Sequence, residues 1–141
     1  KGRYAMRVMI DLARNGQDKF VKLQDLAKRQ DISEKYLEGI LGSLVRAKML
    51  KGVRGKAGGY KLNCDPKKCS VYDVLKHTEI SVAPVICLED KSEACPRKKK
   101  CDTFPIWKEL DQLIQGYLKS ITLDQFIIVS SKCKKRFSPC K

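Results

Sequence analysis

The N-terminal part of the chain shows two helical hydrophobic patterns separated by short breaks. In the first pattern the apolar residues recur at intervals of three and four positions: Ala5, Val8, Met9, Leu12 and Ala13. This spacing is typical of an amphipathic helix, and Asn15 followed by Gly16 predicts its end. The second pattern is shorter and places Leu23, Leu26 and Ala27 on one face before residues 30–33 (QDIS) interrupt it. Two consecutive helices are therefore predicted.

A third helix and a hairpin are predicted next. Ser33 is a suitable N-cap because its hydroxyl can accept a hydrogen bond from a free amide of the first helical turn. The inward-facing residues of this helix are Leu37, Ile40, Leu41, Leu44 and Val45. Residues 50–53 (LKGV) and 60–62 (YKL) can pair as strands, and the glycines of RGKAGGYKL permit a tight turn between them. The predicted order is helix, short helix, turn, helix, hairpin.

The second half predicts two more helices. Ser70 stands three residues before Asp73, which resembles a capping box, and the residues expected to close the core there are Val71, Val74 and Leu75. From Pro105 onward apolar residues recur at close to 3.5-residue spacing: Ile106, Leu110, Leu113, Tyr117 and Ile121. This spacing suits a long helix that packs against its symmetry mate. A helix folded back on its own domain is the alternative.

Charge indicates the kind of partner. The 141 residues are 43% hydrophobic without a long apolar run, so we expect one soluble domain with an appended element and no membrane span or signal peptide. The net charge of +14 favours a polyanionic partner. Residues 1–63 carry fifteen cations and six anions, whereas residues 102–131 carry two and four. The N-terminal half is therefore the expected anion-binding face, and residues 132–141 form a short basic tail.

The predicted order of elements is that of a winged helix-turn-helix. In this arrangement the third helix enters the major groove of DNA and the hairpin, or wing, touches the flanking backbone or minor groove. Lys35 could contact guanine or phosphate, Glu38 could accept from a cytosine amino group, and Arg54 suits a narrow minor groove. An ordinary solvated polar face is the alternative. The expected DNA-binding residues are Lys35, Glu38, Gly39, Arg54, Lys56, Gly58, Gly59 and Tyr60.

A family resemblance supports this interpretation. The segments KGRYAMRVMIDLA, ISEKYLEGILGSLVRAKML and VRGKAGGYKL resemble the winged-helix regulators that include IscR, NsrR and CymR, and the resemblance covers roughly residues 1–128. It implies a bacterial homodimeric transcription factor that binds double-stranded operator DNA. By this resemblance, Glu38 and Arg54 match base-reading positions and Lys35 matches a polar contact position. Gly39 stands where the IscR branch has glutamine, so the operator sequence need not be the same.

Seven cysteines require a separate interpretation. Nothing indicates secretion, and disulfides are uncommon in cytoplasmic proteins. Cys87, Cys95 and Cys101 lie in the loop between the fourth and fifth helices. Thiolates are soft anionic donors that bind iron well, and the cations at 97–100 would offset part of a cluster's negative charge. By spacing alone, the three thiols fit an iron-sulfur cluster, a zinc site, a redox-active pair or incidental thiols.

The resemblance favours the cluster among these four. Cluster-binding members have three cysteines in this loop and a tryptophan six residues after the third, as Trp107 is here, although the first gap is two residues longer in this chain. The fourth ligand differs, because Phe104 and Arg3 stand where members have histidine or aspartate. The candidates are a backbone or solvent donor, an exogenous thiol, Glu89, Asp90, Asp102 or a remaining cysteine. A two-iron and a four-iron cluster both stay open, and His77 is expected to be an exposed cation.

We therefore predict a mainly α fold, a winged helix-turn-helix with a two-stranded wing and a long dimerisation helix. The predicted parts are a DNA-binding domain (1–80), a cysteine-rich cluster loop (81–102), a dimerisation helix with a following short helix (103–128) and a basic tail (129–141). The predicted function is a cytoplasmic transcription regulator that senses iron-sulfur, redox or nitric-oxide status. The sequence lacks a phosphate-cradling loop and a nucleophile–base pair, so no enzyme is expected.

Two alternatives to this function stay open. One is a cluster-free regulator of the same fold, controlled by a protein partner, a small molecule or thiol oxidation. The more remote one is an interaction module that binds RNA or an anionic surface. Against this module stands the scarcity of aromatic residues near the cations, because readers of single-stranded RNA usually stack bases on exposed rings.

Overall fold

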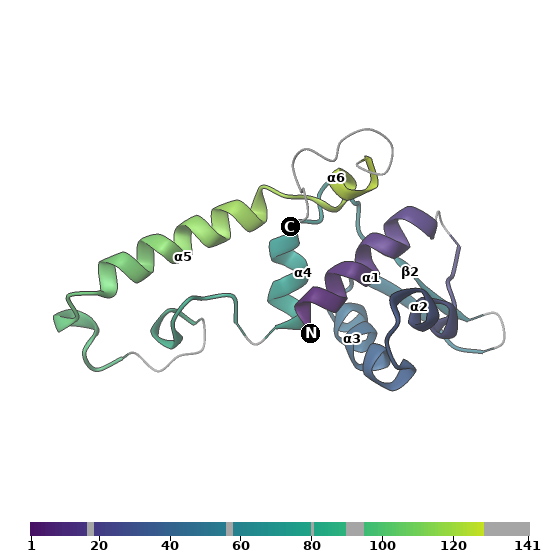
Figure 1. Cartoon of the computed structure of the whole chain (residues 1–141), viewed down its shortest axis with the longest axis horizontal. Coiled ribbons are helices and arrows are strands. Elements are labelled where there is room, and N and C mark those ends of the chain that lie inside the picture. The colour runs from purple at the N-terminus through teal and green to yellow at the C-terminus, as the bar shows by residue number, and fades with distance from the viewer. Residues whose placement is uncertain (17–18, 56–57, 80, 90–94, 129–141) are drawn as a thin grey trace.

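The computed structural model describes residues 1–16, 19–55, 58–79, 81–89 and 95–128. The helices and strands in chain order are α1 (Gly2–Asn15), α2 (Leu23–Gln30), α3 (Glu34–Arg46), β1 (Leu50–Val53), β2 (Gly59–Leu62), α4 (Val71–Thr78), α5 (Phe104–Lys119) and α6 (Leu123–Ile128) (Figure 1). Two short 3-10 turns, Ile86–Leu88 and Lys98–Lys100, lie between α4 and α5. This order confirms the predicted mainly α, winged helix-turn-helix fold.

The first three helices form as their patterns predict. α1 ends at Asn15, and the Gly16 amide continues its hydrogen bonding by donating to Leu12 O. α2 stops at Asp31, whose left-handed backbone (φ 54°) turns the chain toward α3. The Ser33 hydroxyl then accepts a hydrogen bond from the Tyr36 amide at 3.3 Å and caps α3. A tight turn between two capped helices therefore sets the direction of α3.

The core lies where α1, α2, α3 and α4 meet the base of the wing. Most of its buried residues are aliphatic, and burying one such side chain fully contributes about 1.5–3 kcal/mol. They are Ala5, Val8, Met9, Leu12, Leu26, Ala27, Leu37, Ile40, Leu41, Leu44, Met49, Leu50, Cys69, Val74 and Leu123. The N-terminal helices thus share one apolar core with α4 and with Leu123 of α6, and the outer face of α3 stays available to solvent.

The chain returns to this core after α5. α4 begins with the predicted capping box: Ser70 Oγ accepts from the Asp73 amide, and the Asp73 carboxylate accepts from the Ser70 amide. The Val71 amide donates to Ile121 O at 2.8 Å, and the Leu123 amide donates to Cys69 O at 3.0 Å. These bonds hold the start of α6 beside the start of α4.

One sequence prediction for the long helix is wrong. Ile121 was placed on the same apolar stripe as Leu113 and Tyr117, but α5 ends at Lys119. The Ser120 hydroxyl donates to Tyr117 O, and the chain continues from there to α6 without helical structure until Leu123 (Figure 1). Ile121 is buried beside α4, where its carbonyl accepts a hydrogen bond from the Val71 amide, even though its spacing continues the helical pattern.

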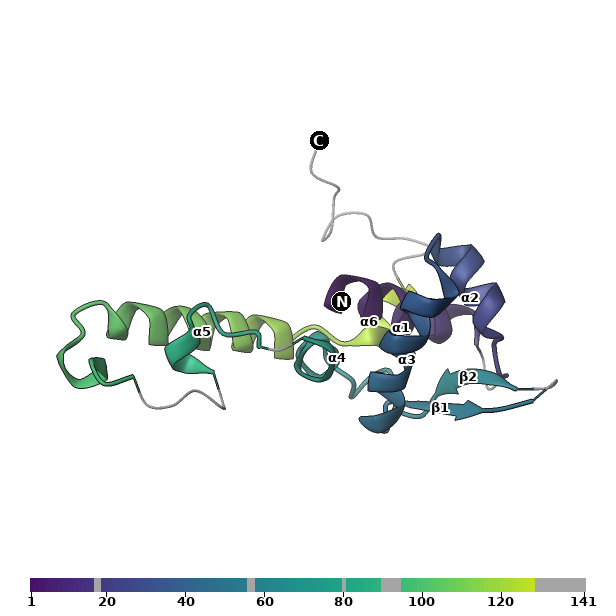
Figure 2. The ribbon, with the colours of Figure 1, turned by 90° about the horizontal axis from the view of Figure 1, so that it is seen from below.

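α5 leaves the helical bundle instead of folding back over it (Figures 1 and 2). The segment between α4 and α5 runs out beside it and carries the two 3-10 turns. The apolar stripe on α5 is solvent-exposed: Ile106 (63%), Leu110 (38%), Leu113 (65%) and Tyr117 (60%). Within the described residues, no helix is both long enough and apolar enough to span a bilayer.

Candidate nucleic-acid interface and cysteine loop

The outer face of α3 carries the residues predicted to read DNA. Lys35, Glu38 and Gly39 are all exposed, whereas Leu37, Ile40 and Leu41 face the core. A side chain added at Gly39 would meet no atom within 4 Å. Within the described residues, nothing lies over Gly39, so this face can approach a groove.

The wing is a short antiparallel hairpin. β1 and β2 pair so that Leu50 lies opposite Leu62 at one end and Val53 lies opposite Gly59 at the other. Gly55 has a φ of +105°, a conformation that favours glycine, and a Cβ at Gly58 would lie 2.3 Å from Val53 O. Arg54 is exposed beside this turn, as predicted. Lys56 lies outside the described residues.

The base of the wing is anchored to the segment before α2. Val21 and Tyr60 exchange two backbone hydrogen bonds of 2.9 and 2.8 Å. A Cβ at Gly59 would stand only 2.4 Å from Val21 O, so the close approach requires glycine. Gly59 is buried and Tyr60 packs against the core. These two residues, predicted as DNA contacts, shape and fix the wing, and no sequence motif marked Val21 as their partner.

A shallow depression joins the wing to the helices. It lies between the start of α2, the start of α3 and the hairpin, and its charged lining residues are Lys22, Glu34 and Arg54. Lys22 was not singled out in the sequence, because it belongs to no motif and reaches this surface only through the fold. Lys35 is the next residue after Glu34 on α3. Together with Lys22 and Arg54 it supplies the cations that phosphate contacts need.

A second group of cations lies at the start of α1. The guanidinium groups of Arg3 and Arg7 stand 5.4 and 5.5 Å from the Tyr4 ring centroid. Tyr4 in turn meets Tyr36 of α3 edge to face, with centroids 5.7 Å apart. No sequence motif predicts this cluster, because α1 and α3 are brought together only by core packing. It extends the cationic surface around the first turn of α3.

An ion pair holds α2 in place against α1. Asp11 is nearly buried, and its two carboxylate oxygens accept hydrogen bonds from Arg29 at 2.8 and 3.1 Å. Asn15 and Gln30 also donate to it. Burial alone would raise the pKa of Asp11, but the bonds from Arg29, Asn15 and Gln30 outweigh it and hold that pKa below its usual value. The carboxylate therefore stays charged and fixes the position of α2.

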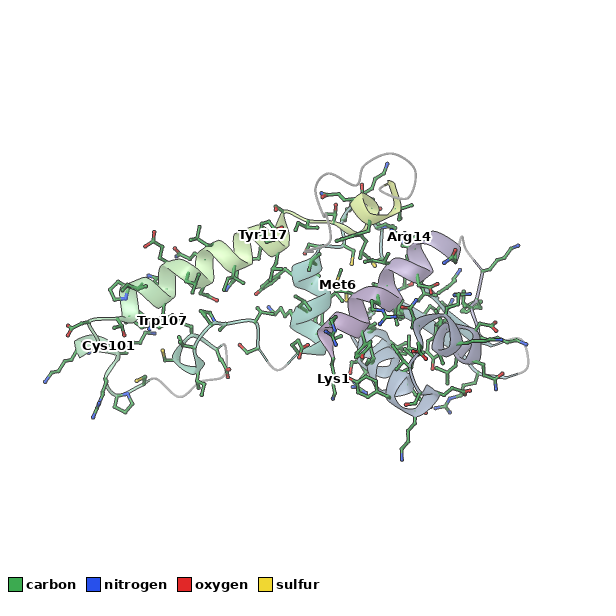
Figure 3. All side chains as sticks on the ribbon, in the orientation of Figure 1. Lys1, Met6, Arg14, Cys101, Trp107 and Tyr117 are labelled. Atoms are coloured by element: carbon green, nitrogen blue, oxygen red, sulfur yellow. The ribbon has the colours of Figure 1, made fainter. Side chains whose placement is uncertain are left out.

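The cysteine loop lies at the far end of the molecule from the wing. Cys101 and Trp107 lie at the outer end of α5, Tyr117 lies near its inner end, and Arg14 belongs to the helical bundle (Figure 3). Cys87 belongs to the turn Ile86–Leu88, and Cys101 follows the turn Lys98–Lys100. Cys87, Cys95 and Cys101 are each partly exposed free thiols.

The donor chemistry of this loop fits a thiolate-bound metal group. Cys101 Sγ lies 3.4 Å from Thr103 Oγ1, and this hydrogen bond lowers the pKa of the Cys101 thiol. A lowered pKa favours the thiolate, the form that binds metal. Among the described residues, however, no three His, Cys, Asp or Glu side chains are close enough to hold one metal ion. The structure therefore supplies the donors but does not bring Cys87, Cys95 and Cys101 together.

The candidates for a fourth ligand are scattered. Glu89 lines a hollow beside α4, and Asp102 is exposed next to Cys101. His77 is exposed near the end of α4. Asp90 and the tail cysteines, Cys133 and Cys140, lie outside the described residues.

Cys64 and Cys69 form a separate thiol pair after the wing. A hydrogen bond between the two lowers the pKa of Cys64 and, together with burial, raises that of Cys69. Cys69 is only 4% exposed and belongs to the core. Both thiols precede α4, whereas the cysteine loop follows it. Cys69 packs in the hydrophobic core.

The comparisons with known proteins agree with this geometry. Residues 1–128 match the family model Rrf2, described as an iron-dependent transcriptional regulator. The HTH-type transcriptional regulator IscR of Serratia proteamaculans is 35% identical over 127 residues, which cover 90% of this chain and 76% of that protein. Its name, like that of the family, is that of a regulator and not of an enzyme, which confirms the sequence prediction.

Two solved structures share the fold. CymR, the global cysteine regulator of B. subtilis, superposes with a TM-score of 0.69 at 30% identity, covering 94% of this chain and 95% of that one. IscR of T. potens superposes with a TM-score of 0.67 at 28% identity, covering 99% and 90%. The winged helix-turn-helix fold of this chain is thus shared with solved structures of CymR and IscR.

Proposed function

The chain belongs to the Rrf2 family of transcriptional regulators, and from this premise we propose that it is a homodimer that binds operator DNA and responds to an iron-sulfur cluster held by its cysteine loop. The observation that carries the DNA-binding part is the exposed outer face of α3 beside the anchored wing. Lys35 on the outer face of α3 and Arg54 at the tip of the wing are exposed cations on these two surfaces. In this proposal residues 1–80 bind DNA, residues 81–102 hold the cluster, residues 103–128 form the dimerisation helix with the following short helix, and residues 129–141 form a basic tail.

The residues of this interface have different roles. Lys35 contacts phosphate or guanine, and Glu38 accepts from a cytosine amino group in the major groove. Arg54 enters the minor groove at the flank of the site. Gly58, Gly59 and Tyr60 hold the wing in the shape that brings Arg54 there, and Gly39 allows close approach of α3. Lys56 is proposed as a further phosphate contact of the wing.

The homodimer uses the apolar stripe of α5. Ile106, Leu113 and Tyr117 are each at least 60% exposed, an unusual exposure for three large apolar residues on one helix. Packing this stripe against that of a second copy buries all three. Two copies related by a two-fold axis present two α3 helices, which suits a palindromic operator with half-sites about one DNA turn apart.

The cluster is held by Cys87, Cys95 and Cys101, with a fourth ligand from the candidates above or from outside the chain. When bound, it supplies iron that reacts with oxidants and nitric oxide. The hydrogen bond from Thr103 lowers the pKa of Cys101 and so favours the thiolate that binds metal, and the cations of the turn Lys98–Lys100 offset part of the anionic charge. Because the loop joins α4 to α5, a loop that changes shape also changes the position of one helix relative to the other.

Arg54→Ala tests the DNA-binding interface. The parent protein first selects a duplex from a random pool, and the affinity for this duplex is then measured by fluorescence anisotropy at fixed salt. We expect Arg54→Ala to weaken binding by about 1–3 kcal/mol. Lys67→Ala is the matched control, because Lys67 is an exposed cation in the turn next to α6. Equal losses in the two variants, or none in Arg54→Ala, would reject the wing assignment.

Iron and sulfide analysis tests the cysteine loop. Protein purified anaerobically and reconstituted with iron and sulfide should show both elements and a visible chromophore, and Cys101→Ala should lose them. Cys64→Ala is the control, because Cys64 lies outside the loop. Full iron content in Cys101→Ala, or a parent that resists reconstitution, would remove the cluster and leave a cluster-free regulator of the same fold.

A further inference from the structure

The single buried residue of α5 is an aspartate. Asp111 is 9% exposed, while every other residue of this helix is partly or fully exposed. Its Oδ2 accepts a hydrogen bond from Gln115 Nε2 at 2.8 Å, but its Oδ1 is buried and has no hydrogen-bond partner among the described residues. A buried carboxylate oxygen without a partner is costly, because water solvated it in the unfolded chain. This position therefore calls for a donor that the described chain does not supply.

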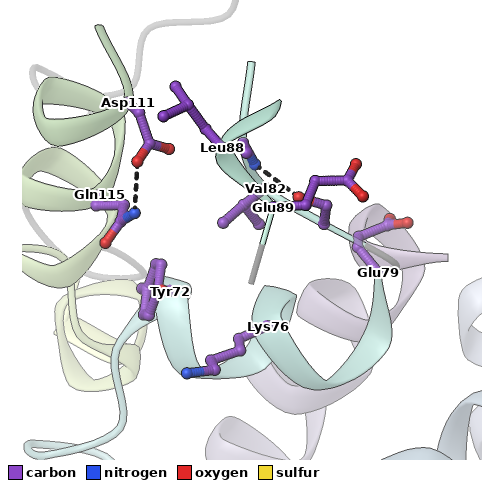
Figure 4. A pocket seen from close by; sticks show the side chains of 10 residues that line it. Tyr72, Lys76, Glu79, Val82, Leu88, Glu89, Asp111 and Gln115 are labelled. Carbon is purple, nitrogen blue, oxygen red and sulfur yellow. Dashed lines mark hydrogen bonds between the residues drawn. The ribbon is translucent and has the colours of Figure 1, made fainter. Parts of the chain in front are cut away.

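Asp111 lines a hollow of about 420 Å³ between α4, the segment 81–89 and α5. Figure 4 shows Asp111 and Gln115 on α5 facing the segment that carries Leu88, with α4 closing the third side. A hollow of this size is in the range of small-molecule sites. The lining residues are Tyr72, Lys76, Glu79, Ser81, Val82, Ala83, Leu88, Glu89, Asp111 and Gln115.

The charge of this hollow is opposite to that of the chain. Three of its lining residues are carboxylates and one is a lysine, whereas cations outnumber acids 30 to 16 in the whole protein. The Glu79 carboxylate already accepts a hydrogen bond from the Gly2 amide and lies 3.3 Å from the N-terminal ammonium, so the proposal rests on the carboxylate of Asp111, which has the one buried oxygen without a partner among the described residues. A buried carboxylate attracts a cation locally, while the remaining basic surface repels it. Anionic ligands are disfavoured by the unpaired Oδ1 of Asp111 itself.

The carboxylates are not arranged for a metal ion. No three acidic, histidine or cysteine side chains of the described chain are close enough to hold one ion. The wall between the acids is apolar or aromatic at Val82, Leu88 and Tyr72. Acids separated by apolar contacts suit an organic cation, whose nitrogen donates to one carboxylate while its carbon chain covers the wall.

A second copy of the chain does not explain Asp111. Successive helical residues are rotated by about 100°, so Leu113 of the exposed stripe lies about 160° around α5 from Asp111. By the same rotation Leu110 lies about 100° from Asp111, Tyr117 about 120° and Ile106 about 140°, so the stripe is turned away from the carboxylate. Asp111 faces α4 and the segment 81–89 of its own chain.

From these observations we propose that the hollow at Asp111 binds a small organic cation, an ammonium or guanidinium compound with a short aliphatic chain. The nitrogen donates to Oδ1 of Asp111, and the chain lies against Leu88 and Val82. α4 packs against α1 and α3 of the DNA-binding domain, and α5 carries the apolar stripe of the proposed dimer. The ligand therefore lies between the DNA-binding domain and the dimerisation helix. An effect of the bound cation on DNA affinity rests on the proposed function. The binding of the cation at Asp111 does not depend on it.

The test uses agmatine, which has a guanidinium and an ammonium joined by four carbons. Trp107, the sole tryptophan, lies one helical turn before Asp111 and reports binding by its fluorescence, with isothermal titration calorimetry as the second readout. We expect saturable binding of agmatine and none of 1,4-butanediol, its neutral counterpart. Asp111→Asn should weaken binding roughly tenfold or more, the loss expected for a charged hydrogen bond.

Two variants complete the design. Glu109→Gln removes an exposed carboxylate from the same helix and should leave agmatine binding unchanged. Leu88→Lys places an ammonium beside Asp111 and should abolish agmatine binding while raising the melting temperature. A circular dichroism melt of each variant confirms that it folds, and Leu88→Lys keeps the test decisive if Asp111→Asn does not fold.

Several results would overturn the proposal. They are no saturable agmatine binding by the parent, equal binding by Asp111→Asn, binding by Leu88→Lys as tight as that of the parent, or binding of Mg²⁺ at Asp111 without binding of agmatine. If agmatine binds as expected but does not change duplex affinity, the site stands and only its link to the proposed function fails. If the protein does not bind duplex DNA at all, the agmatine titration still decides the site.

Discussion

Replacing Asp11 by asparagine tests how the fold positions the helix-turn-helix. Asp11 of α1 accepts two hydrogen bonds from Arg29 of α2, at 2.8 and 3.1 Å. It also accepts from Gln30 at 2.5 Å and from Asn15 at 3.1 Å. The substitution keeps the shape of the side chain but removes its charge and turns one acceptor into a donor that faces other donors. The tie between α1 and α2 is thereby weakened without opening a cavity.

The expected cost follows from these contacts. A hydrogen bond to a charged group contributes about 1.5–3 kcal/mol, and bonds that share one carboxylate are not additive. The Asp11 side chain is 5% exposed, but that of Arg29 is 40% exposed, so water can replace part of what Arg29 loses. We therefore expect Asp11→Asn to lower the free energy of unfolding by about 2–3 kcal/mol. With a urea slope of about 1–3 kcal/mol per M, the midpoint falls by about 0.7–3 M.

The same pair predicts a pH dependence. The pKa of Asp11 is lower in the folded chain than in the unfolded one, so its stabilisation is fully present above the unfolded pKa of about 3.9 and is lost as the pH falls through the folded pKa. The difference in unfolding free energy between parent and Asp11→Asn should be full at pH 7 and should shrink below about pH 4.

Urea titrations at pH 7 and pH 3.5 measure both effects, with Asp31→Asn as the control. Asp31 is exposed, and asparagine tolerates its positive φ of 54°. A loss below 0.5 kcal/mol in Asp11→Asn at pH 7, or a difference from the parent that does not change with pH, would refute this reasoning.

Three further predictions concern the proposed interface and dimer. Glu38→Ala should lower discrimination between DNA sequences more than overall affinity, because the carboxylate repels phosphate and accepts only from the correct base; an unchanged consensus after selection from a random pool would count against this role. Gly59→Ala should cost about 2–4 kcal/mol in a thermal melt because its Cβ would meet Val21 O, whereas Gly39→Ala, in open space, should be neutral or stabilising by up to about 1 kcal/mol; equal melts would contradict the anchoring of the wing. Leu113→Glu should convert the dimer to a monomer in analytical ultracentrifugation, with Gln112→Glu unaffected, and a dimer that persists would exclude the α5 stripe as the interface.

Local patterns predicted much of the fold. The spacing of Ala5, Val8, Met9 and Leu12 was sufficient for α1, and Ser33 and Ser70 marked the starts of α3 and α4. The glycines around Arg54 predicted the hairpin because a turn of that kind depends on the local backbone alone. Each of these features is decided by residues that are close neighbours in the chain.

What the sequence did not predict depends on distant contacts. Ile121 continued the spacing of α5, yet the backbone bond from Val71 draws it into the core. Val21 and Asp11 carry no motif, and their partners Tyr60 and Arg29 are found only once the helices pack. Asp111 falls on a face turned away from the apolar stripe, where a solvated carboxylate is the default expectation. For the cysteine loop, the spacing of the thiols predicted the donors but could not predict how the loop arranges them.

The most direct test of the central claim is selection of duplex DNA from a random pool by the full chain, with an excess of single-stranded DNA as competitor. The proposal that two α3 helices and two wings read one site predicts an enriched palindromic motif whose half-sites lie about 34–36 Å apart, one DNA turn. No enrichment, or enrichment that single-stranded DNA abolishes, would contradict it.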